Sequence, residues 1–92
     1  MQILNARLVG KQRANAVYCG RPSVYGNPFF MKNESMRAQV CDQYREWIYQ
    51  PAQAWLRAKM KEDLIGKDLI CWCAPARCHC ETIREIVESK EI

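Results

Sequence analysis

The sequence predicts a small α/β domain, in which a sheet of about three strands is covered by three helices in the order β-β-α-α-β-α. Three short runs, at 3–9, 16–19 and 69–72, have the length and composition of strands. Between residues 33 and 66, and again near the end of the chain, apolar residues recur at helical spacing. A length of 92 residues suits one domain, and we expect residues 1–92 to form a single compact domain.

The first half of the chain predicts two strands and a helix. Ile3 to Val9 alternates in part, and a polar turn separates it from a short strand at Ala16 to Cys19. A helix should begin at Asn33 or Ser35, either of which can cap it, and should run to about Gln50.

The second half predicts two more helices and a buried strand. Pro51 suits the first turn of a helix that Gly66 ends. Leu69 to Trp72 is apolar without alternation, so we expect a strand inside the sheet, parallel to an earlier one because two helices supply the crossover. The last helix follows His79. We expect these side chains to be mostly buried: Val40, Tyr44, Trp47, Ile48, Trp55, Leu56, Leu69, Ile70, Ile83, Ile86 and Val87.

The composition favours a folded domain over a disordered, membrane-spanning or secreted protein. A hydrophobic content of 49% indicates a folded domain. No apolar run approaches the roughly 20 residues of a membrane span, and the first residues lack a signal-peptide pattern. We therefore expect a cytoplasmic protein with reduced thiols and no membrane partner, whose six cysteines serve metal binding, reactivity or packing. The net charge of +4 fits a small anionic ligand or loose nucleic-acid contact, and equally an ordinary solvated surface.

Two stretches carry the chemistry. Gly20 to Phe29, GRPSVYGNPF, has two Gly and two Pro in ten residues, which indicates a loop of defined shape. Leu69 to Glu81, LICWCAPARCHCE, places four of the six cysteines and the only histidine between a strand and a helix. Ligands of open α/β sheets bind at such junctions. We expect the two stretches to meet and form one crevice.

Together these stretches resemble a known family. GRPSVYGNPF and, at 66–83, GKDLICWCAPARCHCETI resemble the patterns GRPS-x-x-GNPF and GK-x-L-x-CWC-x-P-x-x-CHG-D of domain of unknown function 4326, a family of small phage and bacterial proteins. Tyr44 and Trp47 match its helical aromatic pair. The resemblance implies a phage or prophage gene product and brings no established activity. The chain departs from the pattern at Cys80-Glu81, where the family resembles Gly-Asp, and at Cys19, so neither cysteine is a strong candidate for an essential group.

The candidate catalytic residues are Cys78 and His79. A helix N-terminus lowers the pKa of a nearby thiol and attracts anions, and a histidine can act as acid or base near neutral pH. The candidate ligand-binding residues are Arg21, Ser23, Tyr25, Asn27 and Arg77. Arginine offers a planar fork to phosphate or carboxylate, and a tyrosine at an exposed loop tip can stack on a base. The alternative is structural: Asn27 closes its own turn and His79 caps the helix.

Zinc is a possible cofactor, and no metal site is assigned. If zinc binds, its ligands are Cys71, Cys73, Cys78 and His79, although neighbouring ligands on one ion are strained and Cys78 and Cys80 should diverge at a helix start. The alternative is that the thiols are small buried hydrophobic groups. We expect Cys78 to be the most reactive thiol and Cys71 to be inert, because burial in a central strand raises its pKa.

Two functional hypotheses follow. In the first, the crevice binds a small phosphorylated or nucleotide-like anion, with or without catalysis. In the second, the protein is a non-enzymatic partner of a host protein or nucleic acid, and its Cys/His motif is structural or binds zinc.

Overall fold

The computed structural model describes residues 1–89, and its three-stranded sheet and four α-helices confirm the α/β class. The strands are β1 (Ile3–Asn5), β2 (Ala16–Tyr18) and β3 (Asp68–Cys71), in the order β1-β3-β2. Both outer strands pair with β3 in parallel, and Leu69 of β3 lies between Ile3 and Val17. The central, parallel position predicted for the third strand is confirmed.

The first strand is shorter than expected, because the chain turns into a helix at residue 6. The helix α1 (Ala6–Val9) is capped by Asn5, whose Oδ1 accepts a hydrogen bond from the Arg7 N–H at 2.8 Å. Gly10 ends this turn at a φ of 77°. An asparagine side chain that binds the backbone two residues ahead competes with the sheet ladder. The predicted strand from Ile3 to Val9 is therefore wrong after Asn5.

The remaining helices are α2 (Arg37–Ile48), α3 (Ala54–Leu64) and α4 (Cys80–Glu88), with 3₁₀ turns at Glu34–Met36 and Pro51–Gln53. Their boundaries follow the predicted signals: Asn33 caps the turn before α2, Pro51 opens the turn before α3, and Gly66, at a φ of 74°, follows the C-cap of α3. Within the described part of the chain, no helix has the length and apolar character needed to cross a membrane.

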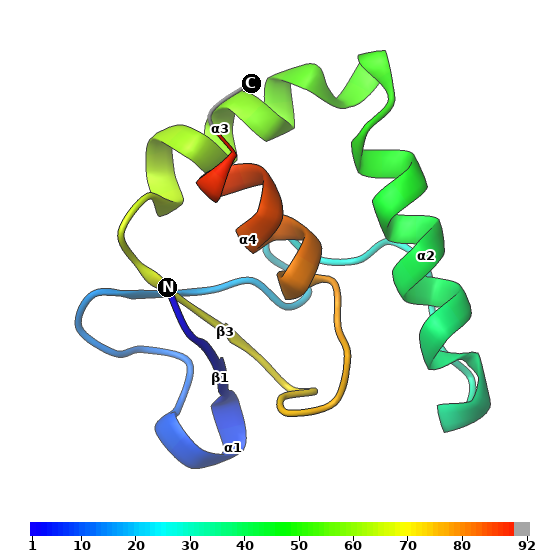
Figure 1. Ribbon diagram of the computed structural model, residues 1–92. Helices are drawn as coiled ribbons and strands as arrows, with labels where there is room; N and C mark the ends of the chain where they lie inside the picture. The colour runs from blue at the N-terminus through cyan, green and yellow to red at the C-terminus, as the bar shows by residue number, and fades with distance from the viewer. Residues whose placement is uncertain (90–92) are drawn as a thin grey trace.

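The core lies where α4 packs against α3 and β3 (Figure 1). The largest fully buried side chains are Tyr44, Ile48, Leu56, Met60, Leu64, Leu69, Ile70, Ile83 and Ile86. Trp47 is only partly buried against this core. Trp55 is 57% exposed, so its predicted burial is wrong. The buried residues of α3 are Leu56, Met60 and Leu64, spaced by four, and Trp55 lies about 100° around the helix from that row.

Candidate functional site

A cavity of about 320 Å³ opens between the Gly20–Phe29 loop, the start of α2 and the segment that joins β3 to α4. Its volume lies at the lower end of the range for small-ligand pockets. The lining residues are Tyr18, Gly20, Arg21, Asn27, Phe29, Met31, Arg37, Val40, Cys41, Cys71, Trp72, Cys73, Cys78 and His79. The two stretches singled out in the sequence therefore meet at one cavity.

Two arginines line the cavity, and they differ in whether an acidic side chain pairs with them. Arg21 is exposed, its guanidinium lies 4.0 Å from the centre of the Phe30 ring, and it forms no ion pair within residues 1–89. Arg37 is held in place: it donates to both carboxylate oxygens of Glu34, at 2.8 and 2.6 Å, and to the Arg77 carbonyl at 2.9 Å. The hydrogen bond to Glu34 raises the pKa of Arg37. Of these two arginines, Arg21 is the one whose guanidinium is exposed and not already paired with a carboxylate of the described residues.

An aromatic wall stands at the carboxyl ends of two neighbouring strands. Tyr18 ends β2, and Trp72 follows the last residue of β3. The Trp72 indole donates to the Tyr18 hydroxyl at 2.8 Å, and Lys11 lies 5.0 and 5.5 Å from the centres of the two rings. Trp72 is nevertheless 46% exposed. This wall offers a flat, partly open aromatic surface next to positive charge.

The Gly20–Phe29 loop is held mainly by its own side chains. The Asn27 Oδ1 accepts from the Phe29 N–H at 2.8 Å, and its Nδ2 donates to the Val40 carbonyl at 3.2 Å. The Ser23 hydroxyl accepts from the Tyr25 N–H at 3.3 Å. Asn27 lines the cavity, whereas Ser23 and Tyr25 do not. The polar atoms of Asn27 and Ser23 thus shape the loop.

Tyr25 is buried, so the expectation of an exposed ring at the loop tip is wrong. It is 7% exposed, and its hydroxyl donates to the Asp63 carboxylate at 2.9 Å, which ties the loop to α3. Burial first, and then the hydrogen bond to Asp63, raise the pKa of Tyr25 to about 12. The loop is fixed to the body of the protein by this phenol.

This contact predicts a loss of stability at high pH. The pKa of this phenol is about 10 in the unfolded chain and about 12 in the folded protein. Its contribution to the free energy of unfolding is therefore complete below a pH of about 10 and is lost as the pH rises through about 12. Tyr25→Phe removes the phenol and its titration. The melting-temperature advantage of the natural protein over this variant should shrink steadily from pH 10 to pH 12. A constant difference over that range would contradict the assignment.

His79 is buried beside the cavity and bonded to backbone. It is 8% exposed, its Nε2 lies 2.7 Å from the Cys19 carbonyl oxygen, and its ring contacts the Tyr44 ring edge-to-face at 5.1 Å. Burial lowers the pKa of His79, and the hydrogen bond to the Cys19 carbonyl opposes that shift. As the N-cap residue of α4, it makes no side-chain cap. In this arrangement Nε2 joins the start of α4 to the end of β2 and is not free for acid–base chemistry.

Arg77 lies outside the cavity, where it pairs with Asp42 at 2.7 Å, and this hydrogen bond raises its pKa. Arg37 occupies the cavity instead, and the sequence interpretation missed it. A signal was present, because Arg37, Val40 and Cys41 stand at i, i+3 and i+4 of one predicted helix, and all three line the cavity.

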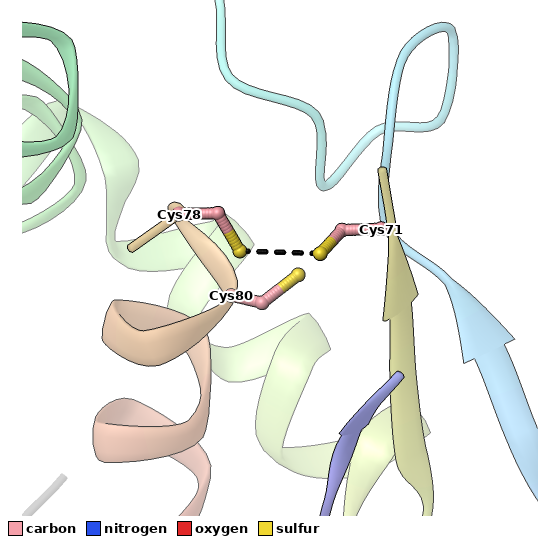
Figure 2. A group of neighbouring side chains, drawn as sticks. All are labelled: Cys71, Cys78 and Cys80. Atoms are coloured by element: carbon pink, nitrogen blue, oxygen red, sulfur yellow. Dashed lines mark hydrogen bonds between the residues drawn. The ribbon is translucent and has the colours of Figure 1, made fainter. Parts of the chain in front are cut away.

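Three buried thiols converge where β3 meets α4. The Sγ atoms of Cys71, Cys78 and Cys80 all lie within 4.8 Å of one another, and those of Cys71 and Cys78 are 3.3 Å apart. Figure 2 shows Cys71 reaching from the end of the strand toward the other two at the start of the helix. Such a group of three cysteines can hold a metal ion.

The thiol pKa values reflect hydrogen bonds among the cysteines. Hydrogen bonding with the neighbouring thiols lowers the pKa of Cys71, whereas burial, the effect expected from the sequence, raises it. Hydrogen bonds with Cys71 and Cys78 raise the pKa of Cys73. The pKa of Cys78 is raised by its bond with Cys71 and lowered more strongly by its bonds with Cys73 and Cys80, with a net decrease.

Comparison with known protein families places the chain in one of them. The chain matches the profile of Domain of unknown function (DUF4326) over residues 5–89. The chain belongs to this family. The matched range contains both the GRPSVYGNPF loop and the Cys/His segment, which confirms the resemblance seen in the sequence. No curated protein and no solved structure matches the chain.

Cys80 is the cysteine that the sequence interpretation of this DUF4326 chain undervalued. The sequence analysis set it aside because it departs from the expected family pattern, yet its thiol lies with those of Cys71 and Cys78. The expected divergence of Cys78 and Cys80 is wrong because Cys78 precedes the N-cap residue His79, before the helical turn begins. Its side chain is therefore not fixed by the helical progression and reaches the same point as that of Cys80.

Proposed function

We propose that this DUF4326 protein, phage-type by resemblance, binds a small phosphorylated or nucleotide-like anion in the cavity. The observation that carries the proposal is Arg21, an exposed guanidinium without an ion pair among residues 1–89, at a cavity that also holds the half-exposed Trp72 ring. A cation and an open aromatic face are the two groups that a nucleotide needs, one for its phosphate and one for its base.

The phosphate would be bound by the arginines. A guanidinium presents parallel N–H donors that match two oxygens of a phosphate or carboxylate. The guanidinium of Arg21 is not engaged by a carboxylate within residues 1–89, so its N–H donors can bind a ligand. Arg37 is held in position by Glu34 and supplies a second positive charge, which that carboxylate partly neutralises. The Asn27 amide already forms hydrogen bonds with the Phe29 N–H and the Val40 carbonyl. We therefore assign the anion to Arg21 first.

The ring of the ligand would lie on the aromatic wall. Stacking of a base on an aromatic side chain contributes about 1–3 kcal/mol. Trp72 is held by its hydrogen bond to Tyr18, so little side-chain entropy is lost when a ring stacks on it. Cys78 also lines the cavity and stays the candidate catalytic thiol for a ligand that reacts.

Calorimetric titration with adenosine monophosphate, inorganic phosphate and adenosine tests this proposal. Adenosine monophosphate should bind more tightly than either fragment. Arg21→Ala should weaken its binding by roughly 10- to 100-fold, the loss of a charge-assisted hydrogen bond. The matched control is Arg13→Ala, which removes an exposed arginine outside the cavity and should change affinity less than twofold.

The outcomes separate the hypotheses. Equal affinity for the monophosphate and for adenosine, together with no effect of Arg21→Ala, would refute an anion site. Much tighter binding of a short single-stranded oligonucleotide than of the mononucleotide would favour the nucleic-acid alternative. Trp72→Ala should weaken the monophosphate while leaving inorganic phosphate unchanged.

A further inference from the structure

We propose that the four thiols of Cys71, Cys73, Cys78 and Cys80 bind one zinc ion at the junction of β3 and α4. This site uses the thiols rather than the arginines, so the anion proposed above does not depend on it, although a Cys78 thiolate bound to zinc would not serve as the catalytic thiol. It also differs from the set that the family pattern suggests, in which His79 takes the place of Cys80.

The sulfur positions already approach those of a zinc site. A tetrahedral zinc ion with Zn–S bonds of about 2.3 Å holds its thiolates roughly 3.8 Å apart. The Sγ atoms of Cys71 and Cys78 are 3.3 Å apart, and those of Cys71, Cys78 and Cys80 all lie within 4.8 Å of one another. Bringing these three sulfurs to zinc geometry requires changes of up to about 1 Å in their separations, which side-chain rotation can supply.

Two of the ligands lie at the ends of regular elements. Cys71 is the last residue of β3, which is paired on both sides, and Cys80 is the first residue of α4. Cys71, Cys78 and Cys80 are 1%, 4% and 0% exposed. In Figure 2 their sulfurs point toward one another across the gap between strand and helix. Closed, buried sites of this kind are those of structural zinc.

Cys73 is the fourth ligand. It stands two residues after Cys71, is partly exposed and lines the same cavity as Cys71 and Cys78, and its side chain must turn toward the three converging sulfurs to complete the site. His79 is a poorer candidate because neither of its ring nitrogens lies in the group of converging ligand atoms, and its Nε2 is bonded to the Cys19 carbonyl at 2.7 Å. The Cys19 thiol, in turn, donates to the Val17 carbonyl at 3.5 Å. A set of four thiolates selects zinc or an iron–sulfur cluster over harder metals.

Metal analysis of the full-length protein, purified without added zinc, tests the inference. We expect about one zinc per chain, and bright tetrahedral cobalt–thiolate absorption when Co²⁺ is added to protein stripped by a chelator. Cys78→Ser should lose most of the zinc. Cys41→Ser, which removes a buried thiol of α2 outside the cluster, should keep it. Stripping should lower the melting temperature by roughly 10–20 °C, as expected for a ligand near 100 times its dissociation constant.

The cobalt spectrum of the natural protein keeps the test decisive if Cys78→Ser does not fold. Absence of both zinc and cobalt bands, with all thiols released only by denaturant, would mean buried structural cysteines and overturn the proposal. A mass two daltons lower would indicate a disulfide, and iron with visible charge-transfer bands would indicate a cluster; either would overturn the zinc assignment. Titration of adenosine monophosphate into zinc-loaded protein tests the anion site separately.

Discussion

Tyr44→Ala should lower the free energy of unfolding by about 3–5 kcal/mol, as removal of a fully buried aromatic ring does. Tyr44 is 0% exposed, and its ring lies 5.1 Å from that of His79 and 5.7 Å from that of Trp47. Its hydroxyl donates to the Tyr25 carbonyl at 3.3 Å. One side chain of α2 thus joins the shaped loop and the start of α4, so its loss should disturb the cavity as well as the core.

Tyr44→Phe is the matched control, because it keeps the ring and removes only the hydroxyl. We expect a loss of about 0.5–1.5 kcal/mol, the usual net contribution of one hydrogen bond. Urea unfolding followed by circular dichroism measures both variants. If the total stability lies near the lower end of the usual range of about 5–15 kcal/mol, the alanine variant should be partly unfolded without urea. Similar losses for the two variants would show that the ring does not support the core.

Local signals were sufficient for most of the fold. The unbroken apolar run at Leu69 predicted a central strand, and Pro51 and Gly66 predicted the ends of the helices. The wrong strand assignment at residues 6–9 has a local cause. The run ILNARLV has enough apolar residues for a strand, but the side chain of Asn5 caps a helical turn that begins at Ala6. Leu8, in that run, is 86% exposed, so its hydrophobicity carried no information about the core.

The site was harder to predict, because its members depend on the direction of side chains. Sequence reasoning brought the two motifs together, and they do share a cavity. It assigned Tyr25 to a ligand, whereas the contact with Asp63, 38 residues away, turns that ring inward. It assigned Arg77 to the ligand and missed Arg37, whereas Arg77 pairs with Asp42, 35 residues away, outside the cavity. Contacts between distant residues leave no trace in spacing along the chain.

The two proposals constrain each other through charge. A zinc ion with four thiolates carries a net charge of −2, which would repel a phosphate placed directly on the cysteines. Arg37, which lines the same cavity as Cys71, Cys73 and Cys78, offsets part of that charge. The phosphate of a bound ligand should therefore lie toward Arg21, at the exposed side of the cavity, with its ring on Trp72. In this arrangement zinc stabilises the cavity lining and the arginines select the ligand.

Leu56→Ala should lower the free energy of unfolding by about 2–5 kcal/mol. Trp55→Ala, at the neighbouring position, should change it by no more than about 0.5 kcal/mol. Leu56 is 1% exposed and lies on the inward row of α3 with Met60 and Leu64. Trp55 is the larger and more hydrophobic-looking residue, yet it is 57% exposed.

The comparison tests the orientation of α3 about its own axis. Both variants place alanine at adjacent positions of one helix, so the difference in helix propensity between them is small compared with the cavity that loss of Leu56 creates. Chemical unfolding of both variants gives the two free energies. If Trp55→Ala proved the more destabilising change, α3 would have to be rotated by about 100° toward the orientation that the aromatic pattern alone predicts, with Trp55 in the core.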